Sequence, residues 1–582
     1  MVKCPFDKIV YHKPCQYRTD KRIDSVIGFD TETYKDGTPF LFCTSTGSVW
    51  YREDIPAALF DRTYRNTQFG VWNLKFDSGS LLYHLPPENK TELREQTKTA
   101  YGDFKYRYIP HKMLRITKGK NSVTFWDINT FFKMSLDNAA FKYLGKRKFA
   151  LGTKTFTSDY YKKNRLKIIK YCKRDADLVK LLYDYLYAGL IKLDIYPKAL
   201  YSEASLSYHY FSNNTKIITV WRYWEHYREL IKYACESYGG GKFEIYRRGR
   251  FNGVSYDINS AYPYELANLI DISKATCYKS KEYDRDAVYG FLRVEISNPH
   301  GLHIPCAVKF GTLNIYPAGT FNVTITKGEY DYMLSVGIKI KILSAWWMLV
   351  ETKRRPYHSI VMDLYKKKQS FKGVDKRMYH IVKVMLNGFY GKTIQLIEYP
   401  DGDYHAGAGF NPVYAAVITA NTRIRICDVC NRLKGKVYAV HTDSVICKDT
   451  IPRNLQGVHL GQWNKEDEGD GLLIASGVYQ IADKNRFRGL EITDTLTWFD
   501  HLKKYNNESI IPIPQTVVLS WVSANVRGKD YLANRFLYGF KDINLNCDNK
   551  RLWPGKATAK IIRESHQNSV PHLLTGGTVL YK

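Results

Sequence analysis

The 582-residue sequence contains no run of about 18 apolar residues, so it offers no candidate for a membrane-spanning helix. Its start, MVKCPFDKIVYHKPC, lacks the apolar core of a secretory signal peptide. No repeat with a period of roughly 20 to 50 residues and no low-complexity tract is visible. These absences predict a globular chain that is neither exported nor inserted in a membrane.

Acidic residues and paired cysteines are also scarce. The chain has 57 Asp and Glu residues against 87 Lys and Arg, and the net charge of +30 favours a polyanionic partner such as a nucleic acid. Of the 11 cysteines, only Cys427 and Cys430 have CxxC spacing, and no second pair nearby completes a zinc site. We expect these two to be buried on a helix. An odd number of cysteines in a chain without an export signal predicts reduced thiols.

Aromatic and apolar residues are abundant. Hydrophobic residues make up 44% and charged residues 25% of the sequence, which are the values of a folded protein. The 47 tyrosines among many lysines suit a nucleic-acid channel, where rings stack on bases, although tyrosines also fill protein cores. At roughly 150 residues per domain, the length corresponds to about four structural units.

Alternating strand and helix patterns predict an α/β protein with several units. Residues 164–193 have the periodicity of one long helix, and a proline soon after it marks a domain boundary near residue 195. The stretch 271–350 has strand patterns separated by turns. Residues 358–390 are expected to form two basic helices joined at about Gly373.

Four carboxylates in the N-terminal third have positions that suit a metal site. Asp30 and Glu32 close an apolar run, and residues i and i+2 of a strand point to the same face. Tyr171 and Asp175 stand at i and i+4 on the predicted helix, and Asp77 lies between these segments. Clustered carboxylates repel one another unless cations neutralise them, so we expect divalent metals that activate water for phosphodiester hydrolysis, with Tyr171 orienting the water. Taken singly, each residue also fits a solvated surface position.

The order of these residues resembles the three motifs of the 3′–5′ proofreading exonuclease found in family B DNA polymerases. DxE, Asn-x2-Phe-Asp and Tyr-x3-Asp follow one another along the chain. The resemblance implies an RNase H-like exonuclease domain. Its metal ligands would be Asp30, Glu32, Asp77 and Asp175, its further catalytic residue Tyr171, and its contacts with single-stranded DNA Asn73 and Phe76.

A second centre is predicted around Asp257. The sequence VSYDINSAYP suggests a strand that ends at Asp257, a tight turn and a helix that begins after Pro263. Backbone N–H groups at such a turn can hold a triphosphate. The segment resembles the family B motif Dx2SLYP, with Ala261 in the Leu position. The resemblance implies that Asp257 and the carbonyl of Ile258 bind the catalytic metals and that Tyr262 stacks under the deoxyribose.

A basic and polar stripe is predicted on a later helix. Lys376, Lys383, Asn387 and Tyr390 would lie on one face of it. Lysines on phosphates and a tyrosine against the base fit an incoming nucleotide, whereas a solvated helix face is the other interpretation. The stretch KVMLNGFYGKT resembles the family motif Kx3NSxYG, with Gly388 in the Ser position, which favours nucleotide binding.

The sequence VYAVHTDSVIC predicts two short strands around a turn with Asp443 at its tip. It resembles the motif YxDTDS, whose last Asp binds the catalytic metals, and which would here contact DNA through His441 and Thr442. Ala439 replaces the Tyr and His441 the first Asp, and His is a poorer Mg²⁺ ligand than a carboxylate, although Mn²⁺ accepts it. We expect Asp257 and Asp443 to suffice, with His441 orienting the turn or the primer end. A hairpin histidine without a special role is the alternative.

Two further resemblances concern DNA contacts. Tyr238 with Gly240 and Gly241 is similar to the YxGG/A motif, which links the exonuclease and polymerase modules and contacts the template. Tyr479 is similar to the Tyr of the KxY motif, which contacts the primer, but Gly477 stands where Lys is expected.

Over most of its length the chain resembles the protein-primed family B polymerases of bacteriophages, viruses and linear plasmids. That implies an α/β multidomain fold, in which an RNase H-like 3′–5′ exonuclease domain precedes a right-hand polymerase with palm, fingers, thumb and a β-rich insertion. The 56 positions from Asn387 to Asp443 leave room only for a reduced second insertion. The expected units are the exonuclease 1–195, a first palm segment 196–270, an insertion of the terminal-protein-contacting type 271–355, fingers 356–393, the reduced second insertion 394–411, a second palm segment 412–509 and thumb 510–582.

The functional hypothesis is template-directed DNA synthesis with 3′–5′ proofreading, by two-metal nucleotidyl transfer, for replication of a small linear viral or plasmid genome in the host cytoplasm. Each site would hold two Mg²⁺ or Mn²⁺ ions. The partners would be DNA template and primer, dNTPs and a terminal protein as primer, and the chain would act as a monomer. The alternatives are a DNA-primed or primer-independent polymerase, a 3′–5′ exonuclease with a degenerate polymerase site, and a non-catalytic binder of single strands.

Overall fold

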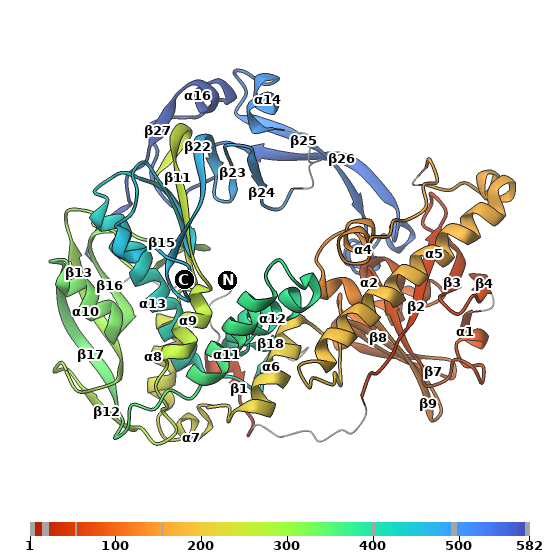
Figure 1. The fold of residues 1–582 in the computed structure, drawn as a ribbon, viewed down its shortest axis with the longest axis horizontal. Coiled ribbons are helices and arrows are strands. Elements are labelled where there is room, and N and C mark those ends of the chain that lie inside the picture. Colours follow the sequence, from red (N-terminus) through yellow and green to blue (C-terminus); the bar gives the residue numbers. More distant parts are fainter. Residues whose placement is uncertain are drawn as a thin grey trace.

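The computed structural model describes residues 6–13, 22–52, 55–153, 155–398, 402–490 and 497–576. Within these ranges, two large β-sheets lie on opposite sides of an elongated molecule, and the hairpin of β25 and β26 bridges them (Figure 1). None of the described helices is long and apolar enough to cross a bilayer. The nine described cysteines are free thiols, as predicted, and eight of them are buried. The same prediction for Cys4 and Cys15 lies outside the described residues.

The N-terminal sheet has the strand order β4-β3-β2-β5-β9-β8-β7-β6, in which β2, β5 and β9 run parallel. Its long helix α5 (Ser158–Ile191) packs against β2 and confirms the helix predicted at 164–193. The helix begins earlier because Thr157 caps it, accepting a hydrogen bond from the N–H of Tyr160. The strands are β2 Ile27–Thr33, β3 Pro39–Thr44, β4 Val49–Trp50, β5 Gln68–Val71, β6 Lys98–Tyr101, β7 Phe104–Ile109, β8 Met113–Lys118 and β9 Asn121–Asp127.

The second large sheet has the order β10-β20-β21-β11-β22-β23-β24, with β27 beside β11. Helix α13 (Pro412–Arg432) packs on it and carries Cys427 and Cys430, both fully buried as predicted. Helix α9 begins at Ala261 (Ala261–Asn268) instead of after Pro263, because proline fits the first turn, where its missing N–H breaks no hydrogen bond. The strands are β10 Lys242–Ile245, β11 Arg247–Ile258, β20 Val437–Thr442, β21 Ser444–Cys447, β22 Trp463–Ala475, β23 Val478–Ile481, β24 Lys484–Phe487 and β27 His566–Asn568.

A five-stranded sheet of order β12-β17-β13-β16-β28 lies to one side of the second sheet (Figure 1). It confirms the strand content predicted for 271–350, except that helix α10 (Lys327–Ser335) interrupts it. Its last strand comes from near the end of the described chain and pairs with β16 in parallel. The strands are β12 Thr276–Ser280, β13 Tyr289–Asn298, β16 Ala318–Thr326, β17 Lys339–Leu349 and β28 Leu573–Thr575, with the separate pair β14 Val308–Phe310 and β15 Leu313–Ile315.

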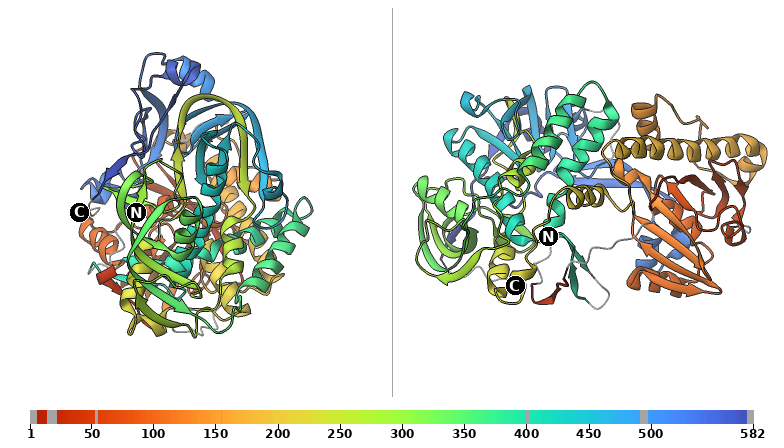
Figure 2. Two further views of the ribbon diagram at one scale, coloured as in Figure 1. Left: turned by 90° about the vertical axis from the view of Figure 1, so that its left-hand side faces the viewer. Right: turned by 60° about the horizontal axis from the view of Figure 1, so that its bottom comes forward.

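Helices α11 (His358–Phe371) and α12 (Lys376–Gly388) are the predicted basic pair, and Gly373 lies in their turn with a φ of 79°. Strand β1 (Ile9–Val10) pairs with β19 in a small sheet of order β1-β19-β18 (Figure 2). The other elements named below are β18 Leu396–Glu398, β19 Tyr404–Ala406, β25 Ile510–Val518, β26 Phe536–Asn544, α2 Leu74–Leu81, α3 Pro87–Gln96, α4 Leu136–Leu144, α6 Glu203–Asn214, α8 Arg228–Ser237, α14 Trp498–Lys503, α15 Trp521–Val526 and α16 Ala559–Glu564.

A buried ion pair joins the five-stranded sheet to the second large sheet. Arg423 of α13, only 1% exposed, binds Glu329 of α10 at 2.7 Å. Its guanidinium also donates to the main-chain oxygens of Gly240 and Pro305, both at 2.6 Å. Loss of either charged partner would leave the other charge buried and unpaired, so the pair fixes how α10 and the segment before β10 sit on α13.

His303, near this junction, gives a prediction about pH. Burial lowers its pKa to about 3, and Lys242 and Arg551 add to the effect while Glu244 opposes it. In the unfolded chain this histidine is protonated below about pH 6.5, whereas in the folded chain it stays neutral down to about pH 3. The free energy of unfolding therefore falls as the pH drops from about 6.5 toward 3.

We expect His303→Gln to reduce the stability lost between pH 7 and pH 5 by on the order of 1 kcal/mol. The measurement is the free energy of urea unfolding of variant and parent at both pH values. Because other groups titrate equally in both proteins, the difference isolates this side chain. Parallel pH profiles for the two proteins would contradict the prediction.

Candidate active sites

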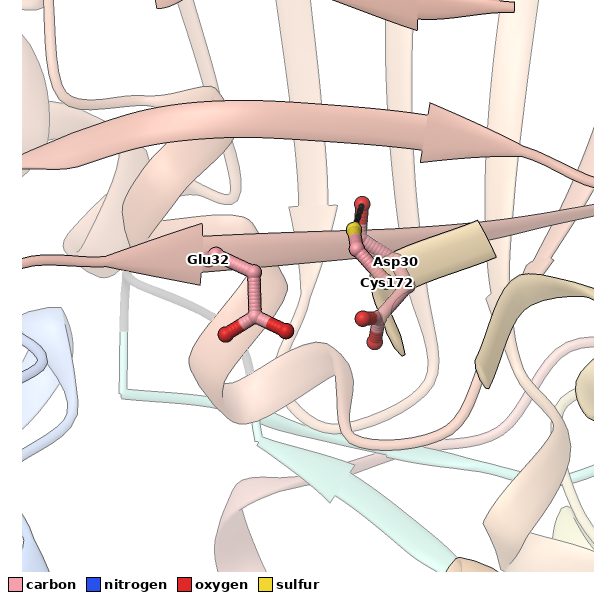
Figure 3. A group of neighbouring side chains, drawn as sticks. All are labelled: Asp30, Glu32 and Cys172. Atoms are coloured by element: carbon pink, nitrogen blue, oxygen red, sulfur yellow. Dashed lines mark hydrogen bonds between the residues drawn. The ribbon is translucent and has the colours of Figure 1, made fainter. Parts of the chain in front are cut away.

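The first site lies where β2 meets α5. Gly28 permits the contact, because a Cβ at this position would lie 1.9 Å from the main-chain oxygen of Ala176. The close approach brings Asp175 of α5 near Asp30 and Glu32 of β2, and its charge raises the pKa of both strand residues. The carboxylates of Asp30 and Glu32 point to the same side of the strand (Figure 3).

Asp77 of α2 completes this group of carboxylates. Its side chain is 3% exposed, and its Oδ1 accepts a hydrogen bond from Thr31 Oγ1 at 3.0 Å. Burial raises the pKa of Asp77 to about 7. Burial and then the neighbouring acids raise the pKa values of Asp30 and Glu32 well above their usual range. Protons or bound cations are the two ways to relieve such repulsion.

The donor atoms fit divalent cations. Asp175 Oδ1 is buried and has no hydrogen-bond partner among the described residues, while Oδ2 pairs with Lys148 Nζ. An unpartnered carboxylate oxygen beside further carboxylates is the ligand set that a hard cation prefers. Lys148 Nζ also lies 4.9 Å from the ring centre of Tyr171. Sequence reasoning missed this lysine, because it stands in a stretch with several other basic residues and no motif marks it.

Three further residues border the first site. The sulfur of Cys172 is near the carboxylates, but its S–H donates to the main-chain oxygen of Asp30 at 3.6 Å, so it is turned away from them (Figure 3). Asn73 precedes α2 and is exposed, and Phe76, in the first turn of α2, is partly exposed. Both predicted single-strand contacts therefore lie next to Asp77 and are accessible from solvent.

The second site is formed by adjacent strands of the second large sheet. Asp257 of β11 pairs with Ser444 of β21, and the N–H of Ile258 donates to the main-chain oxygen of Asp443 at 2.9 Å. The β20–β21 hairpin predicted around Asp443 is present, with Thr442 in the left-handed region at a φ of 63°. Two acids that are 186 positions apart in sequence thus meet at one point of the sheet.

Electrostatics mark this point as a cation site as well. Burial raises the pKa of Asp257 to about 8, and Asp443 and Glu466 add to the rise. Burial, with Glu466 adding, raises the pKa of Asp443 to about 6. Glu466 lies on β22, close to Asn464, which pairs with Asp257. Sequence reasoning missed this third carboxylate, because it belongs to an acidic run in which spacing distinguishes no member.

Two lysines face the second site. Lys383 of α12 and Lys368 of α11 are the cations that oppose the raised pKa of Asp257 most. Lys368 Nζ donates to Ser260 Oγ at 2.9 Å, directly before α9. The predicted Lys376 is exposed at the start of α12, two turns before Lys383, so it is a weaker partner of Asp257 than Lys368, which the sequence did not single out.

A cluster of three tyrosines lies beside these carboxylates. The rings of Tyr262 and Tyr390 have centroids 4.4 Å apart, and the hydroxyls of Tyr390 and Tyr238 are 2.8 Å apart. Burial, together with Asp443, raises the pKa of Tyr262. Asn387, one turn before Tyr390, is exposed, and its amide donates to the main-chain oxygen of Lys383. The structure therefore brings together the tyrosines predicted to contact sugar, base and template.

Gly240 and Gly241 are required for close packing. The oxygen of Gly240 accepts from Arg423, and its φ is 66°. A Cβ at Gly241 would lie 2.6 Å from Thr442 Cγ2, in the turn that carries Asp443. Both glycines thus hold the link before β10 against the second site.

His441 lies in an aromatic stack, away from the carboxylates. It is 9% exposed, its ring stacks on Tyr479 with centroids 5.0 Å apart and planes 5° apart, and Phe243 is 4.8 Å away. Burial, followed by the charges of Arg488 and Lys550, lowers its pKa to about 4, so the ring is neutral at pH 7. Neither ring nitrogen has a hydrogen-bond partner among the described residues.

Arg488 occupies the space that Gly477 leaves beside this stack. Gly477 has a φ of 80°, and a Cβ there would lie 2.8 Å from Arg488 Cδ. The guanidinium of Arg488 lies 4.7 Å from the ring centre of Phe243. A cation is therefore present at this point, although the position where the related motif has lysine is a glycine.

Comparison with known proteins gives partial matches to DNA polymerases. Residues 152–398 match the family described as DNA polymerase type B, organellar and viral. The chain is 25% identical over 290 residues to the DNA polymerase of Acidianus bottle-shaped virus (isolate Italy/Pozzuoli), a match over 46% of this chain and 42% of that protein. It is 23% identical over 274 residues to the DNA-directed DNA polymerase of Enterobacteria phage PRD1, over 41% of this chain and 48% of that protein. Over the matched residues the chain is thus similar to type B DNA polymerases.

The chain spans less than half the length of the viral relatives it matches. Its fold is similar to Phi29 DNA polymerase complexed with primer-template DNA and incoming nucleotide, with a TM-score of 0.63 and 15% identity, over 90% of this chain and 100% of that one. The complex of Phi29 DNA polymerase with single-stranded DNA gives a TM-score of 0.62 at 14% identity, over the same shares. The predicted fold class, an α/β multidomain chain, is thereby confirmed.

Proposed function

We propose that this chain is a template-directed DNA polymerase with a 3′–5′ proofreading exonuclease. The observation that carries the proposal is the meeting of Asp257, on β11, with Asp443, in the turn between β20 and β21, next to Lys383, Lys368 and the ring of Tyr262. A protein that only bound nucleic acid, without catalysis, would gain nothing from buried carboxylates that repel one another. The net charge of +30 adds the attraction to DNA backbone that every step requires.

In the second site, Asp257, Asp443 and the carbonyl of Ile258 would hold two divalent cations, Mg²⁺ or Mn²⁺. Such ions lower the pKa of a primer hydroxyl and neutralise the leaving pyrophosphate. Lys383 and Lys368 bind the triphosphate as point charges. No described side chain caps the start of α9, directly after Ser260, so its first N–H groups would be available to phosphate oxygens.

Aromatic and polar side chains complete nucleotide binding. Tyr262 lies under the deoxyribose, and its packing on Tyr390 leaves no room for a larger sugar. Tyr390 and Asn387 lie near the base, and Tyr238 holds Tyr390 through its hydroxyl while contacting the template. Lys376 extends the basic stripe of α12 outward.

In the first site, the carboxylates would hold the cations that activate water for cleavage of a frayed primer end. Tyr171, whose ring lies under Lys148, orients this water. Asn73 and Phe76 contact the single strand as it arrives. The cation ligands are Asp30, Glu32, Asp77 and Asp175.

The proposed modules follow the observed elements. The N-terminal sheet with α5 is the exonuclease (1–195), and the second large sheet is the palm (196–270 and 412–509). Helices α11 and α12 are the fingers (356–393), and the hairpin of β25 and β26 belongs to the thumb (510–582). Four strands of the five-stranded sheet, β12, β13, β16 and β17, form the insertion (271–355), and the fifth, β28, comes from the thumb range. Strands β18 and β19 form the reduced second insertion (394–411), of which residues 399–401 lie outside the described ranges.

The finer proposal is priming by the hydroxyl of a terminal protein, in the replication of a small linear viral or plasmid genome in the host cytoplasm. The fold shared with Phi29 DNA polymerase and the five-stranded sheet as a separate surface support it. The chain would act as a monomer. Priming from DNA or without a primer is the alternative within the same chemistry.

One experiment separates these possibilities. The chain is incubated with template, labelled dNTP and, in turn, a DNA primer, no primer or a candidate terminal protein, with Mg²⁺ and then Mn²⁺. Label on the protein hydroxyl supports protein priming, and label on the DNA primer alone supports the DNA-primed alternative. Shortening without extension would leave only the nuclease, and no metal-dependent turnover would leave only a binder.

Arg488 provides a prediction about the primer end. We expect Arg488→Ala to raise the KM for primer-template about tenfold, because a charged contact beside the His441–Tyr479 stack is lost, and Arg488→Lys to recover some of the loss. The measurement is extension rate against primer-template concentration. Lys503→Ala, on the exposed face of α14, is the control for a change of net charge. An unchanged KM in Arg488→Ala would exclude primer contact here.

A further inference from the structure

The tip of the hairpin formed by β25 and β26 lies against the first site. The hairpin begins beside β22 of the palm, where Ile511, Ile513 and Ile543 share a core, and reaches across to the N-terminal sheet (Figure 1). Its tip, residues 519–535, contains α15 and packs on α2 and α3. It therefore touches the helix that carries Asp77.

Asn534 is the deepest polar contact of this tip. It is 1% exposed and lies in the left-handed region with a φ of 62°. Its amide donates to the main-chain oxygen of Phe76 at 3.0 Å and to Ser80 Oγ at 3.1 Å. These acceptors stand on either side of Asp77 in sequence, so one buried side chain holds the turn of α2 that presents this carboxylate.

Trp521 makes a second contact with the same turn. Its Nε1 donates to Ser78 Oγ at 3.0 Å, a hydrogen bond that spans 443 positions of the chain. The ring is 1% exposed and packs on Tyr108 with centroids 5.1 Å apart, within the N-terminal core. A side chain from the hairpin thus completes the core beneath Asp77.

A chain of hydroxyls connects the tip to the carboxylate. Ser80 Oγ, which accepts from Asn534, lies 3.2 Å from Thr31 Oγ1, and Thr31 Oγ1 donates to Asp77 Oδ1. Thr31 stands between Asp30 and Glu32 on β2. The tip, α2 and β2 are therefore joined through one buried network around the cation ligands.

The shape of α2 also depends on the tip. A Cβ at Gly79 would lie 2.5 Å from Asn534 Oδ1, so alanine at this position collides with the docked amide. In a helix without this neighbour, alanine would be the more stable residue. The three atoms nearest to such a Cβ all belong to Asn534, so the docked hairpin accounts for Gly79.

We propose that Asn534 and Trp521 are positioning residues of the nuclease site, and that the docked hairpin tip holds α2 so that Asp77 can share cations with Asp30 and Glu32. The inference rests on the proposed nuclease function of this site. Removing a residue that hydrogen-bonds a metal ligand typically lowers metal affinity or activity by about 10- to 100-fold. The hairpin, which begins beside the proposed palm, thereby fixes the positions of the carboxylates in the distant nuclease site.

The test uses the full chain with Asn534→Gly, which keeps the left-handed backbone and removes the amide. We expect the rate of single-strand degradation to fall about tenfold and the Mn²⁺ concentration for half-maximal rate to rise about tenfold, with extension of a matched primer unchanged. An unchanged metal requirement would overturn the positioning role. A parent chain without any nuclease activity would instead refute the proposed function.

Two further variants keep the test independent of folding defects. Gly79→Ala should lower nuclease activity when introduced into the parent chain. In Asn534→Gly, where the methyl group has space, the same change should cause no further loss of nuclease activity. If the activity losses of the two single variants simply multiplied in the double variant, the inference would be overturned. Asn525→Ala removes the hydrogen bonds of the tip to Thr91 of α3, away from Asp77, and should leave the metal requirement unchanged. An equal shift in Asn525→Ala and Asn534→Gly would also overturn it.

Discussion

Asp443→Asn is expected to abolish primer extension, by about a thousandfold or more, while degradation of single-stranded DNA continues at the parent rate. The substitution removes a cation ligand whose contribution to the transition state amounts to several kcal/mol, and each 1.4 kcal/mol or so is about tenfold in rate. The measurement is extension of a primed template and shortening of a labelled single strand, in parallel.

The fold of Asp443→Asn should survive. Burial and Glu466 already raise the pKa of Asp443 to about 6, so a neutral side chain of the same shape relieves repulsion. Asp467→Asn, next to Glu466 on β22, is the matched control and should extend normally, because Lys484 pairs with both acids but only Glu466 is among those that raise the pKa of Asp443. Loss of both activities in a folded Asp443→Asn protein would contradict the two-site arrangement.

The reverse result is expected for Asp30→Ala combined with Glu32→Ala. Degradation should fall by about a thousandfold or more, because two of the four converging carboxylates are lost, and extension should remain. The two residues lie on β2, far from β11 in the other large sheet (Figure 1). Their removal therefore leaves the second site intact.

A consequence for fidelity gives this double variant an independent readout. Primers with a mismatched end should be extended without prior removal of the mismatch, so the error survives in the product. Asp36→Ala, on the exposed turn after β2, is the control. Continued removal of mismatched ends by the double variant would show that hydrolysis occurs elsewhere.

Much of the fold, and the carboxylates of both sites, could be predicted from short sequence motifs. Asp30 with Glu32, and Asp443 at its hairpin tip, could be recognised because strand and turn geometry is set by neighbours in sequence. Helix α5 and the pair α11 and α12 followed from periodicity for the same reason. Where the chemistry depends on residues a few positions apart, the sequence is sufficient.

Contacts between residues far apart in the sequence could not be predicted from the sequence alone. Lys148, Lys368 and Glu466 each come from a stretch with several residues of like charge, and only tertiary packing selects the one that faces a carboxylate. For His441, the sequence left the role open, and the stack with Tyr479 brings together residues of β20 and β23, which are not neighbours in the sheet. Nothing in residues 519–535 suggested that they would dock on α2.

The N-terminal unit and the rest of the chain cannot be separated without breaking contacts between them. Strand β1 leaves the N-terminal unit to pair with β19, α5 continues toward α6, and Trp521 returns from the far end of the chain to fill the core beneath α2. A fragment ending near residue 195 would expose the surface on which Trp521 packs, and it would lack β19, the strand that pairs with β1. Replacing either part by a foreign one would therefore require all three contacts to be rebuilt, so the two proposed activities, editing and synthesis, would be inherited together.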